Sequence, residues 1–354
     1  MRITNNMMAD NSVWYMNQNL ERLSKAQQQV STQSKIQLPS DDPVVATRAV
    51  KYRHYVAKIE QYQKNAEDAA SWQKVTDSAL GDLSDVMQRV QELTVQASSD
   101  SLTDNDKEDI KAEISQLKEQ VVQVMNTTYA GRYIFGGYSS DTAPYSIEST
   151  SVGDKVKFKG AYLSLGGPMS ASAADADIIS SCQSYAAQMY QDGADESISY
   201  QVGFGSQVTV NVEGQDVIGA ESGANLFDTL DKLLLGLEGE TSYKTATIDT
   251  TTSPATVTVT TETLAMDQLL TDLDSDFERL QNARAGLGAR MNYVATMKTR
   301  LSNDNTTYTT LMSNNEDIDV AEATIELATA QTVYEAALSV GAKVLTHSLL
   351  DYLS

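Results

Sequence analysis

The sequence predicts a mainly α-helical protein with an inserted β-rich domain, in which N- and C-terminal segments form a long coiled-coil helical bundle. Three observations support this class. Apolar residues recur at steps of three and four in both halves of the chain, the middle of the chain alternates apolar and polar residues, and Phe, Trp and Pro are scarce throughout. Because bulky core residues are few, an extended bundle fits this composition well.

Two helices are predicted before the middle of the chain. Thr103 can cap the second helix, and the acidic residues that follow it lie near the positive end of the helix dipole. A short loop joins the two helices, which we expect to be antiparallel. Their apolar residues are Leu83, Val86, Val90, Leu93 and Ala97, then Ile110, Ile114, Leu117, Val121 and Val124.

A third and stronger helical pattern runs from Met266 to Leu301. One uninterrupted helix over this range would be about 50 Å long. Gly286 and Gly288 interrupt the pattern, and each costs up to about 1 kcal/mol relative to alanine. We expect these glycines to mark close contacts between helices.

The middle of the chain, from Gly136 to about Thr261, has a different texture. Helical spacing disappears, and the stretches VKFKGAYLSL, SQVTVNV and ATVTVTTETL alternate with a period of two, which indicates half-buried strands. The likeness of the helical segments on both sides predicts that this block is an insertion. Its expected joints are Gly136-Gly137 and Ser253-Pro254.

Each end of the chain carries a thin apolar stripe that is typical of an amphipathic helix. A buried leucine contributes roughly 1.5 to 3 kcal/mol, whereas ordering each backbone residue costs roughly 1 to 2 kcal/mol. The ends must therefore pair with each other, with other copies, or with both, and we expect them to be disordered until they do. The predicted assembly residues are Ile3, Met7, Leu20, Leu23 and Val30, then Ile325, Ala328, Leu338, Leu345, Leu349 and Leu350.

The acidic group at Ser40 to Asp42 is open to two interpretations. Its carboxylates could bind a cation, but Asp41-Asp42-Pro43 is also a helix-start motif. Asp42 can accept a hydrogen bond from an unpaired amide, and Pro43 has no amide hydrogen to leave unpaired. We favour the helix start.

Composition excludes several classes of function. The net charge of −22, with no local cluster of Lys and Arg, disfavours nucleic acid and anionic membranes as partners. The sequence has no cleavable signal peptide and no apolar run that could span a bilayer. Cys182, His54 and His347 supply too few ligands for a metal site, and no catalytic motif is present, so we expect no enzyme activity and no cofactor.

Four segments carry a resemblance to a known family. They are STQSKIQLPSDDPVVATRA, GRYIFGGYSSDTAPY, GLGARMNYV and DIDVAEATIELATAQTVYEAALSVGAKVLTHSLLDYL. These segments resemble the flagellin family of bacterial axial proteins, and among its members they are most similar to the subunits at the junction between hook and filament. The resemblance covers both helical ends, about two thirds of the chain. The chain departs from the family at Gln33-Ser34-Lys35-Ile36, where a Gly-Lys/Leu-Arg-Ile type of sequence is usual.

The resemblance implies a flagellin-like fold and a structural, extracellular role. It implies export through the flagellar type III channel without a cleaved signal, with a dedicated chaperone beforehand. It also implies a ring of copies that contacts a neighbouring hook-associated protein on one side and flagellin on the other. The expected parts are a terminal coiled coil (1–42 and 315–354), a helical bundle (43–135 and 262–314), and an outward-facing β-rich domain (136–261).

Three other functions remain open at this stage. The chain could be a flagellin filament subunit, because filament flagellins share the same organisation of their ends. The helical spacing alone would also permit a cytoplasmic coiled-coil signalling protein. An enzyme housed in the β-rich block is the remaining alternative, although the sequence locates no pocket for it.

Overall fold

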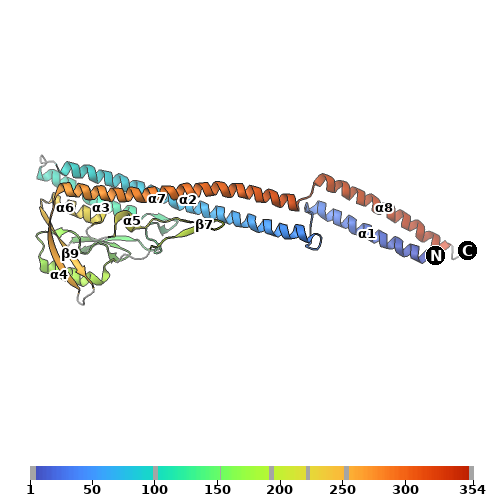
Figure 1. Cartoon of the computed structure of the whole chain (residues 1–354), viewed down its shortest axis with the longest axis horizontal. Coiled ribbons are helices and arrows are strands. Elements are labelled where there is room, and N and C mark those ends of the chain that lie inside the picture. The colour runs from blue at the N-terminus through green and yellow to red at the C-terminus, as the bar shows by residue number, and fades with distance from the viewer. Residues whose placement is uncertain are drawn as a thin grey trace. The chain divides into compact units, whose positions relative to one another are not determined.

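A computed structural model of the protein describes residues 5–98, 103–151, 153–190, 195–220, 224–250 and 255–350. Contacts between residues divide the chain into two compact units. The terminal unit comprises Met1–Gln61 with Arg300–Ser354, and the central unit comprises Tyr62–Thr299. Long helices at both ends of the sequence and strands between them confirm the predicted fold class (Figure 1). The expected division into three parts stays a prediction.

The terminal unit contains α1 (Asn5–Thr32), α8 (Val320–Leu350), the beginning of α2 (Pro43–Ala97) and the end of α7 (Met266–Glu316). α1 and α8 lie side by side, as the blue and red ribbons of Figure 1 show. In this unit α2 turns a stripe of partly or fully buried residues toward α7, at steps of four and three: Val45, Ala49, Tyr52, Val56 and Ile59.

The central unit is built on the remaining parts of α2 and α7 with α3 (Asp104–Met125). The antiparallel direction of α2 and α7 is fixed by side-chain pairs: Arg284 Nε lies 2.9 Å from Asp77 Oδ1, and Gln91 Nε2 donates to Asp274 Oδ1 at 2.6 Å. The buried apolar residues of this seam recur at helical spacing and form its core: Leu80, Leu83, Val90, Leu93, Ile110, Ile114, Leu273, Leu280, Leu287 and Val294.

α3 begins where the sequence predicts. Thr103 and Asp106 form a capping box, in which the Asp106 amide donates to Thr103 Oγ1 and the Thr103 amide donates to Asp106 Oδ2. The Thr103 hydroxyl, 2.6 Å from Asp106 Oδ2, and the Thr103 amide donate to the Asp106 carboxylate and lower the pKa of Asp106. The capping box therefore satisfies two backbone donors at the start of the helix.

The interpretation of Gly286 and Gly288 as close helix contacts is wrong. A methyl group added to either glycine would meet nothing within 4 Å, so no neighbouring helix excludes a side chain there. The helix runs through both positions without interruption from Met266 to Glu316. These glycines are sites of lower helix propensity and do not bring helices together.

The region between α3 and α7 contains small antiparallel sheets within the described residues. Their strand orders are β1-β2, β3-β4-β5, β6-β9-β10 and β7-β8. The three alternating stretches supply β4, β5, β8 and β10, as predicted. The strands are β1 (Thr128–Tyr129), β2 (Arg132–Tyr133), β3 (Tyr145–Thr150), β4 (Gly153–Phe158), β5 (Ala161–Tyr162), β6 (Met169–Ser170), β7 (Ser199–Gly203), β8 (Ser206–Thr209), β9 (Ser242–Asp249) and β10 (Thr256–Thr263).

This region also contains helices, so the expectation that helical spacing disappears there is wrong. They are α4 (Asp175–Tyr185), the 3₁₀ helix η1 (Ala186–Gln188), α5 (Gly214–Ile218) and α6 (Leu226–Leu237). α4 covers the β9-β10 sheet over a core that includes Tyr162, Ile178 and Cys182. The first strands begin before the expected joint at Gly136-Gly137, and the other joint, Ser253-Pro254, lies outside the described residues.

Candidate assembly interface

α1 and α8 meet along partly or fully buried positions that recur at steps of four and three, the spacing of a coiled-coil seam. We call these positions the inner seam. They are Met16, Asn19, Leu23, Ala26 and Val30 on α1, and Ala323, Leu327, Ala330, Tyr334, Ala337 and Gly341 on α8. Most of the α8 members are small, so the inner seam buries little apolar surface.

The burial of individual side chains measures how thin this seam is. Among the described side chains of α1, only Ala26 is a buried apolar residue, and α8 has no fully buried side chain in its described part. By contrast, the α2 and α7 seam of the central unit buries large residues such as Leu83 and Leu280 completely. The pairing of α1 with α8 therefore gains far less hydrophobic stabilisation than the central unit does.

Large apolar side chains on α1 and α8 lie outside the inner seam and remain exposed. We call them the outer apolar residues. Ile325 is 69% exposed and Trp14 is 54% exposed, values that leave most of each side chain in contact with solvent. The group comprises Met7, Val13, Trp14 and Leu20 on α1, and Val320, Ile325, Val333, Leu338 and Val340 on α8.

The predicted assembly residues fall into three groups. Met7, Leu20, Ile325, Ala328 and Leu338 are exposed, whereas Leu23 and Val30 belong to the inner seam. Leu345, Leu349 and Leu350 lie on α8, but their side chains are outside the described part of the structure, and so is Ile3. The single stripe expected on each helix is thus divided between two sets of positions, the inner seam and the exposed outer apolar residues.

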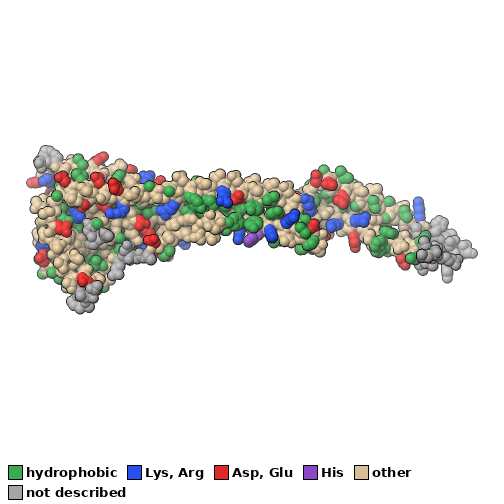
Figure 2. All heavy atoms as spheres, viewed as in Figure 1, with side chains coloured by type: hydrophobic (Ala, Val, Ile, Leu, Met, Phe, Trp, Pro, Cys, Tyr) green, Lys and Arg blue, Asp and Glu red, His purple; other side chains and the backbone are tan. Residues whose placement is uncertain are grey.

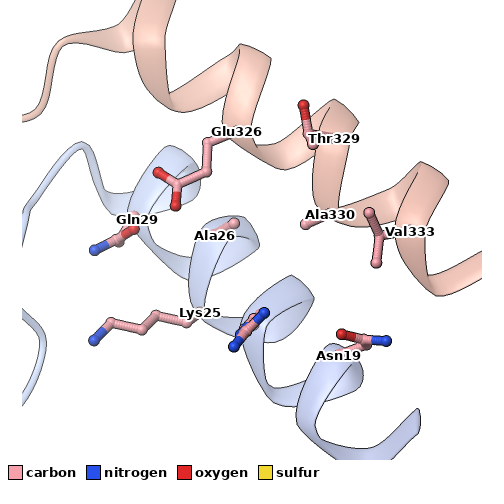
Figure 3. Close-up of a pocket in the computed structure, with 9 residues that line it drawn as sticks. Asn19, Lys25, Ala26, Gln29, Glu326, Thr329, Ala330 and Val333 are labelled. Atoms are coloured by element: carbon pink, nitrogen blue, oxygen red, sulfur yellow. The ribbon is translucent and has the colours of Figure 1, made fainter. Parts of the chain in front are cut away.

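An open groove of about 620 Å³ runs between α1 and α8 (Figure 3). Ala26 and Ala330 face each other across it, and their small side chains leave the space unfilled. Glu326, Thr329 and Val333 line its α8 wall, and Asn19, Arg22, Lys25 and Gln29 lie on the α1 wall. Along this groove the side chains of α1 and α8 do not fill the space between the two helices.

The loop after α1 is held against the connection between α7 and α8. The Ile318 amide donates to the Gln33 carbonyl at 3.2 Å, and the Lys35 amide donates to the Glu316 carbonyl at 2.7 Å. Gln33 has a φ of 56°, a left-handed conformation that favours glycine. The position where the family usually has glycine is therefore one at which the backbone needs it.

Asp41 and Asp42 organise the start of α2. Asp42 Oδ1 accepts hydrogen bonds from the Val44 and Val45 amides, and the helix begins at Pro43. Asp41 Oδ2 accepts from the Leu38 amide at 3.1 Å, and the hydrogen bonds from Leu38 and Gln37 lower the pKa of Asp41. Both carboxylates thus accept hydrogen bonds from backbone amides around the start of α2.

A bidentate ion pair links the two long helices within the terminal unit. Arg53 Nε on α2 lies 3.1 and 3.0 Å from the two carboxylate oxygens of Glu316 at the end of α7. Glu316 is buried, whereas the Arg53 side chain is mostly exposed. The pair fixes the end of α7 beside α2, next to the loop that joins it to α8.

Other kinds of site have little support. The described residues contain no group of three His, Cys, Asp or Glu side chains that could hold a metal ion. None of the helices in the described ranges has the length and apolarity needed to cross a membrane. His54 lies exposed on α2.

Two family models match the helical ends of the chain. The bacterial flagellin N-terminal helical region matches residues 3–140, and the bacterial flagellin C-terminal helical region matches residues 270–353. Together they cover more than half of the sequence, including all of α1, α2 and α8. The chain belongs to the flagellin family.

One hook-associated protein is similar to this chain along most of its length. This flagellin-family chain is 27% identical to flagellar hook-associated protein 3 of Escherichia coli over 90% of its own length and 89% of the relative's. A flagellin of Clostridium tyrobutyricum is 32% identical, but over 36% of this chain and 34% of the relative. The chain is thus homologous to hook-associated protein 3 along most of its length and to flagellins in part.

Solved structures share the fold. A flagellar hook-associated protein from Vibrio parahaemolyticus has a TM-score of 0.55 and 16% identity, covering 78% of this chain and all of that one. FlgL from Xanthomonas campestris has a TM-score of 0.51 and 17% identity, covering 74% of this chain and 99% of that one. At these identities the likeness concerns the fold.

Sequence reasoning missed part of the interface of this flagellin-family chain. Leu327, Tyr334 and the alanines near them form the α8 side of the inner seam, but they were not among the predicted residues. The signal was present as the four-three spacing from Ala323 to Gly341. Side-chain size does not identify the seam, because several of the large apolar side chains of α8 are exposed.

Proposed function

We propose that this chain is a structural axial subunit of the bacterial flagellum that joins the hook to the flagellin filament. The observation that carries the proposal is the similarity to hook-associated protein 3 along 90% of the chain, against about a third of the chain for flagellin relatives. A subunit that joins two different lattices needs a central region that differs from that of a filament subunit, in addition to the helical ends that both share. The extent of the similarity therefore favours the junction role over that of a filament subunit.

The outer apolar residues supply the physical basis for assembly. A heterologous contact repeated around an axis builds a ring or a helix, and two unlike faces let one layer join two lattices. Exposed side chains such as Trp14 and Ile325 gain roughly 25 cal/mol for each Å² that a neighbouring copy removes from water. In this proposal the outer apolar residues, with Leu345, Leu349 and Leu350, form the contacts between copies.

The proposal includes the partners and the location that the family resemblance implies. The subunit forms a ring with its own copies, contacts a neighbouring hook-associated protein and flagellin, and is held by an export chaperone before assembly. It leaves the cell through the flagellar type III channel without a cleaved signal. The segment 136–261 faces outward, 43–135 with 262–314 forms the helical bundle, and the ends form the assembly domain.

Electron microscopy of cells that lack this gene tests the proposal, together with an assay of flagellin in the medium. Bare hooks with flagellin released into the medium are the expected result, since export continues while the filament has no foundation. Re-expression of the gene should restore filaments. Intact filaments on cells without the gene, or the loss of hooks as well as filaments, would contradict the junction role.

The filament subunit is the second candidate. One observation favours it: flagellin relatives reach 31 to 32% identity over 113 to 128 residues, which exceeds the 27% identity to hook-associated protein 3. Polymerisation of the purified chain from filament seeds separates the two. A filament subunit extends long fibres, whereas a junction subunit stops after a limited layer.

A further inference from the structure

The first turns of α2 carry a basic face that the sequence analysis did not detect. Five exposed residues recur at steps of four and three along one side of the helix, and the ring of one of them, Tyr55, lies 5.2 Å from that of Tyr308 on α7. We call this set the basic face: Val44, Arg48, Lys51, Tyr55 and Lys58. Arg48, Lys51, Arg53 and Lys58 fall within eleven residues that contain no Asp or Glu, so the expectation of no local cluster of Lys and Arg is wrong.

The charges of this face have no partner within the described part of the chain. Arg48, Lys51 and Lys58 form no ion pair with any described residue, although Arg53 on the other side of α2 pairs with Glu316. These three cations lie on one side of a helix in a chain whose net charge is −22. Figure 2 shows basic and hydrophobic side chains exposed together on this part of the terminal unit.

α8 carries a complementary surface with the same spacing. We call it the acidic side: Glu322, Glu326, Thr329, Val333, Ala336 and Val340, all of which are exposed. Neither glutamate forms an ion pair with a described residue. On the opposite wall of the groove Lys25 lies 3.5 Å from Asp41, and Arg22 also lines this wall without an ion pair to a described residue.

We propose that the basic face of one copy packs against the acidic side of α8 in a second copy. Both surfaces have the four-three spacing of a coiled-coil seam, and both mix charged with apolar residues. Opposite charges steer the encounter and fix the register, and the apolar members add burial. This inference rests on the proposed function, because it assigns one of the surfaces through which copies of the subunit assemble.

The contact is heterologous, because the two surfaces differ and one copy presents both. Such contacts continue from copy to copy and close into a ring or extend as a helix. The net charge of −22 makes copies of the chain repel one another at their other surfaces. A local attraction between the basic face and the acidic side therefore selects one relative orientation of two copies. A charged contact also weakens as salt increases.

Charge reversal in the purified full-length chain tests the contact by sedimentation velocity at low and high salt. We expect Arg48→Glu with Lys51→Glu, or Glu322→Lys with Glu326→Lys, to lower the association constant about tenfold or more. The fourfold variant, which reverses both surfaces, should recover association. Lys64→Glu with Lys74→Glu makes the same charge change elsewhere on α2 and should leave association unchanged.

Mixing the two reversed variants guards against effects of folding. Each alone should stay monomeric, whereas the mixture should form heterodimers, a result that misfolded protein cannot give. Disulfide capture between Lys51→Cys in one copy and Glu326→Cys in another provides a second readout that detects weak contacts. Association of either double variant like the unchanged chain, or the absence of both heterodimers and capture, overturns the proposal.

The outcome is separable from that of the junction role. Loss of the contact in the purified chain, with bare hooks still seen in cells lacking the gene, removes this inference and keeps the junction role. If the purified chain shows the salt-sensitive contact but cells lacking the gene keep their filaments, this inference stands and the junction role is removed.

Discussion

Gln33 occupies a backbone conformation that suits glycine. A left-handed conformation costs a residue with a Cβ roughly 1 to 2 kcal/mol, and Gln33 has a φ of 56° at the end of α1. We expect Gln33→Gly to slow amide hydrogen exchange in the last turn of α1. Gln28→Gly, the same change inside the helix, should speed exchange there, and equal effects at the two positions would contradict the argument.

Asp276 makes stability depend on pH. Burial raises its pKa from 3.8 to about 6, while Thr229 and Arg279 donate hydrogen bonds to its carboxylate. Because the folded pKa is raised, the protonated form stabilises the fold, and this contribution is lost as pH rises from about 4 through 6. The full difference is about 3 kcal/mol.

Urea unfolding of the chain and of Asp276→Asn between pH 4 and pH 7 measures this dependence. The free energy of unfolding of the unchanged chain should fall relative to that of the variant across this window, since asparagine does not titrate. Parallel pH profiles for the two proteins would show that Asp276 keeps an ordinary pKa.

At the level of helices, Gly286 of α7 tests whether the glycines of this helix only lower its helix propensity. Gly286 is exposed and a methyl group there would contact nothing within 4 Å, so Gly286→Ala should stabilise the central unit by up to about 1 kcal/mol. At Gly166 a methyl carbon would lie 1.9 Å from the Ala246 carbonyl oxygen. Gly166→Ala should therefore destabilise the unit by more than about 1 kcal/mol in the same urea titration.

The helices of the chain differ in how much apolar surface holds them. The seam between α1 and α8 contains one buried apolar side chain, Ala26, among the described residues, whereas α2 and α7 bury large side chains in the central unit. We expect amide exchange in the isolated chain to be fast along α1 and α8 and slow along residues 80–93 and 273–294. Strong protection of both terminal helices in a monomer would contradict the expectation that they become ordered on assembly.

For the whole molecule, stability and assembly should separate. Leu338 is exposed, so Leu338→Asp should change the melting of the central unit little but block incorporation into the flagellum, because the charge would fall in a contact between copies. We expect the same of Leu345→Asp and Leu349→Asp. Leu280→Asp, which places a charge in the core, should instead unfold the chain. Complementation of cells lacking the gene measures incorporation, and normal filaments from Leu338→Asp would refute the assembly role of this residue.

Much of the fold could be predicted because it depends on local periodicity. The spacing of apolar residues determined α2, α3 and α7, Thr103 and Asp42 determined two helix starts, and alternation determined β4, β8 and β10. The helices α4, α5 and α6 could not be recognised in the same way. They are short, and α4 packs on β9 and β10 while α6 packs on α3, elements distant in sequence, so their burial patterns depend on tertiary neighbours.

The sequence by itself determined that this chain has helical ends with apolar stripes and a mixed middle, since periodicity and composition are properties of neighbouring residues. Only the tertiary structure decided which side of each helix packs against another helix and which side is exposed. It assigned Leu23 and Val30 to the inner seam, left Leu20 and Ile325 exposed, and gathered Arg48, Lys51 and Lys58 on one face. The physical reason is that exposure depends on the partner helix, which lies far away in the sequence and becomes a neighbour only when the chain folds.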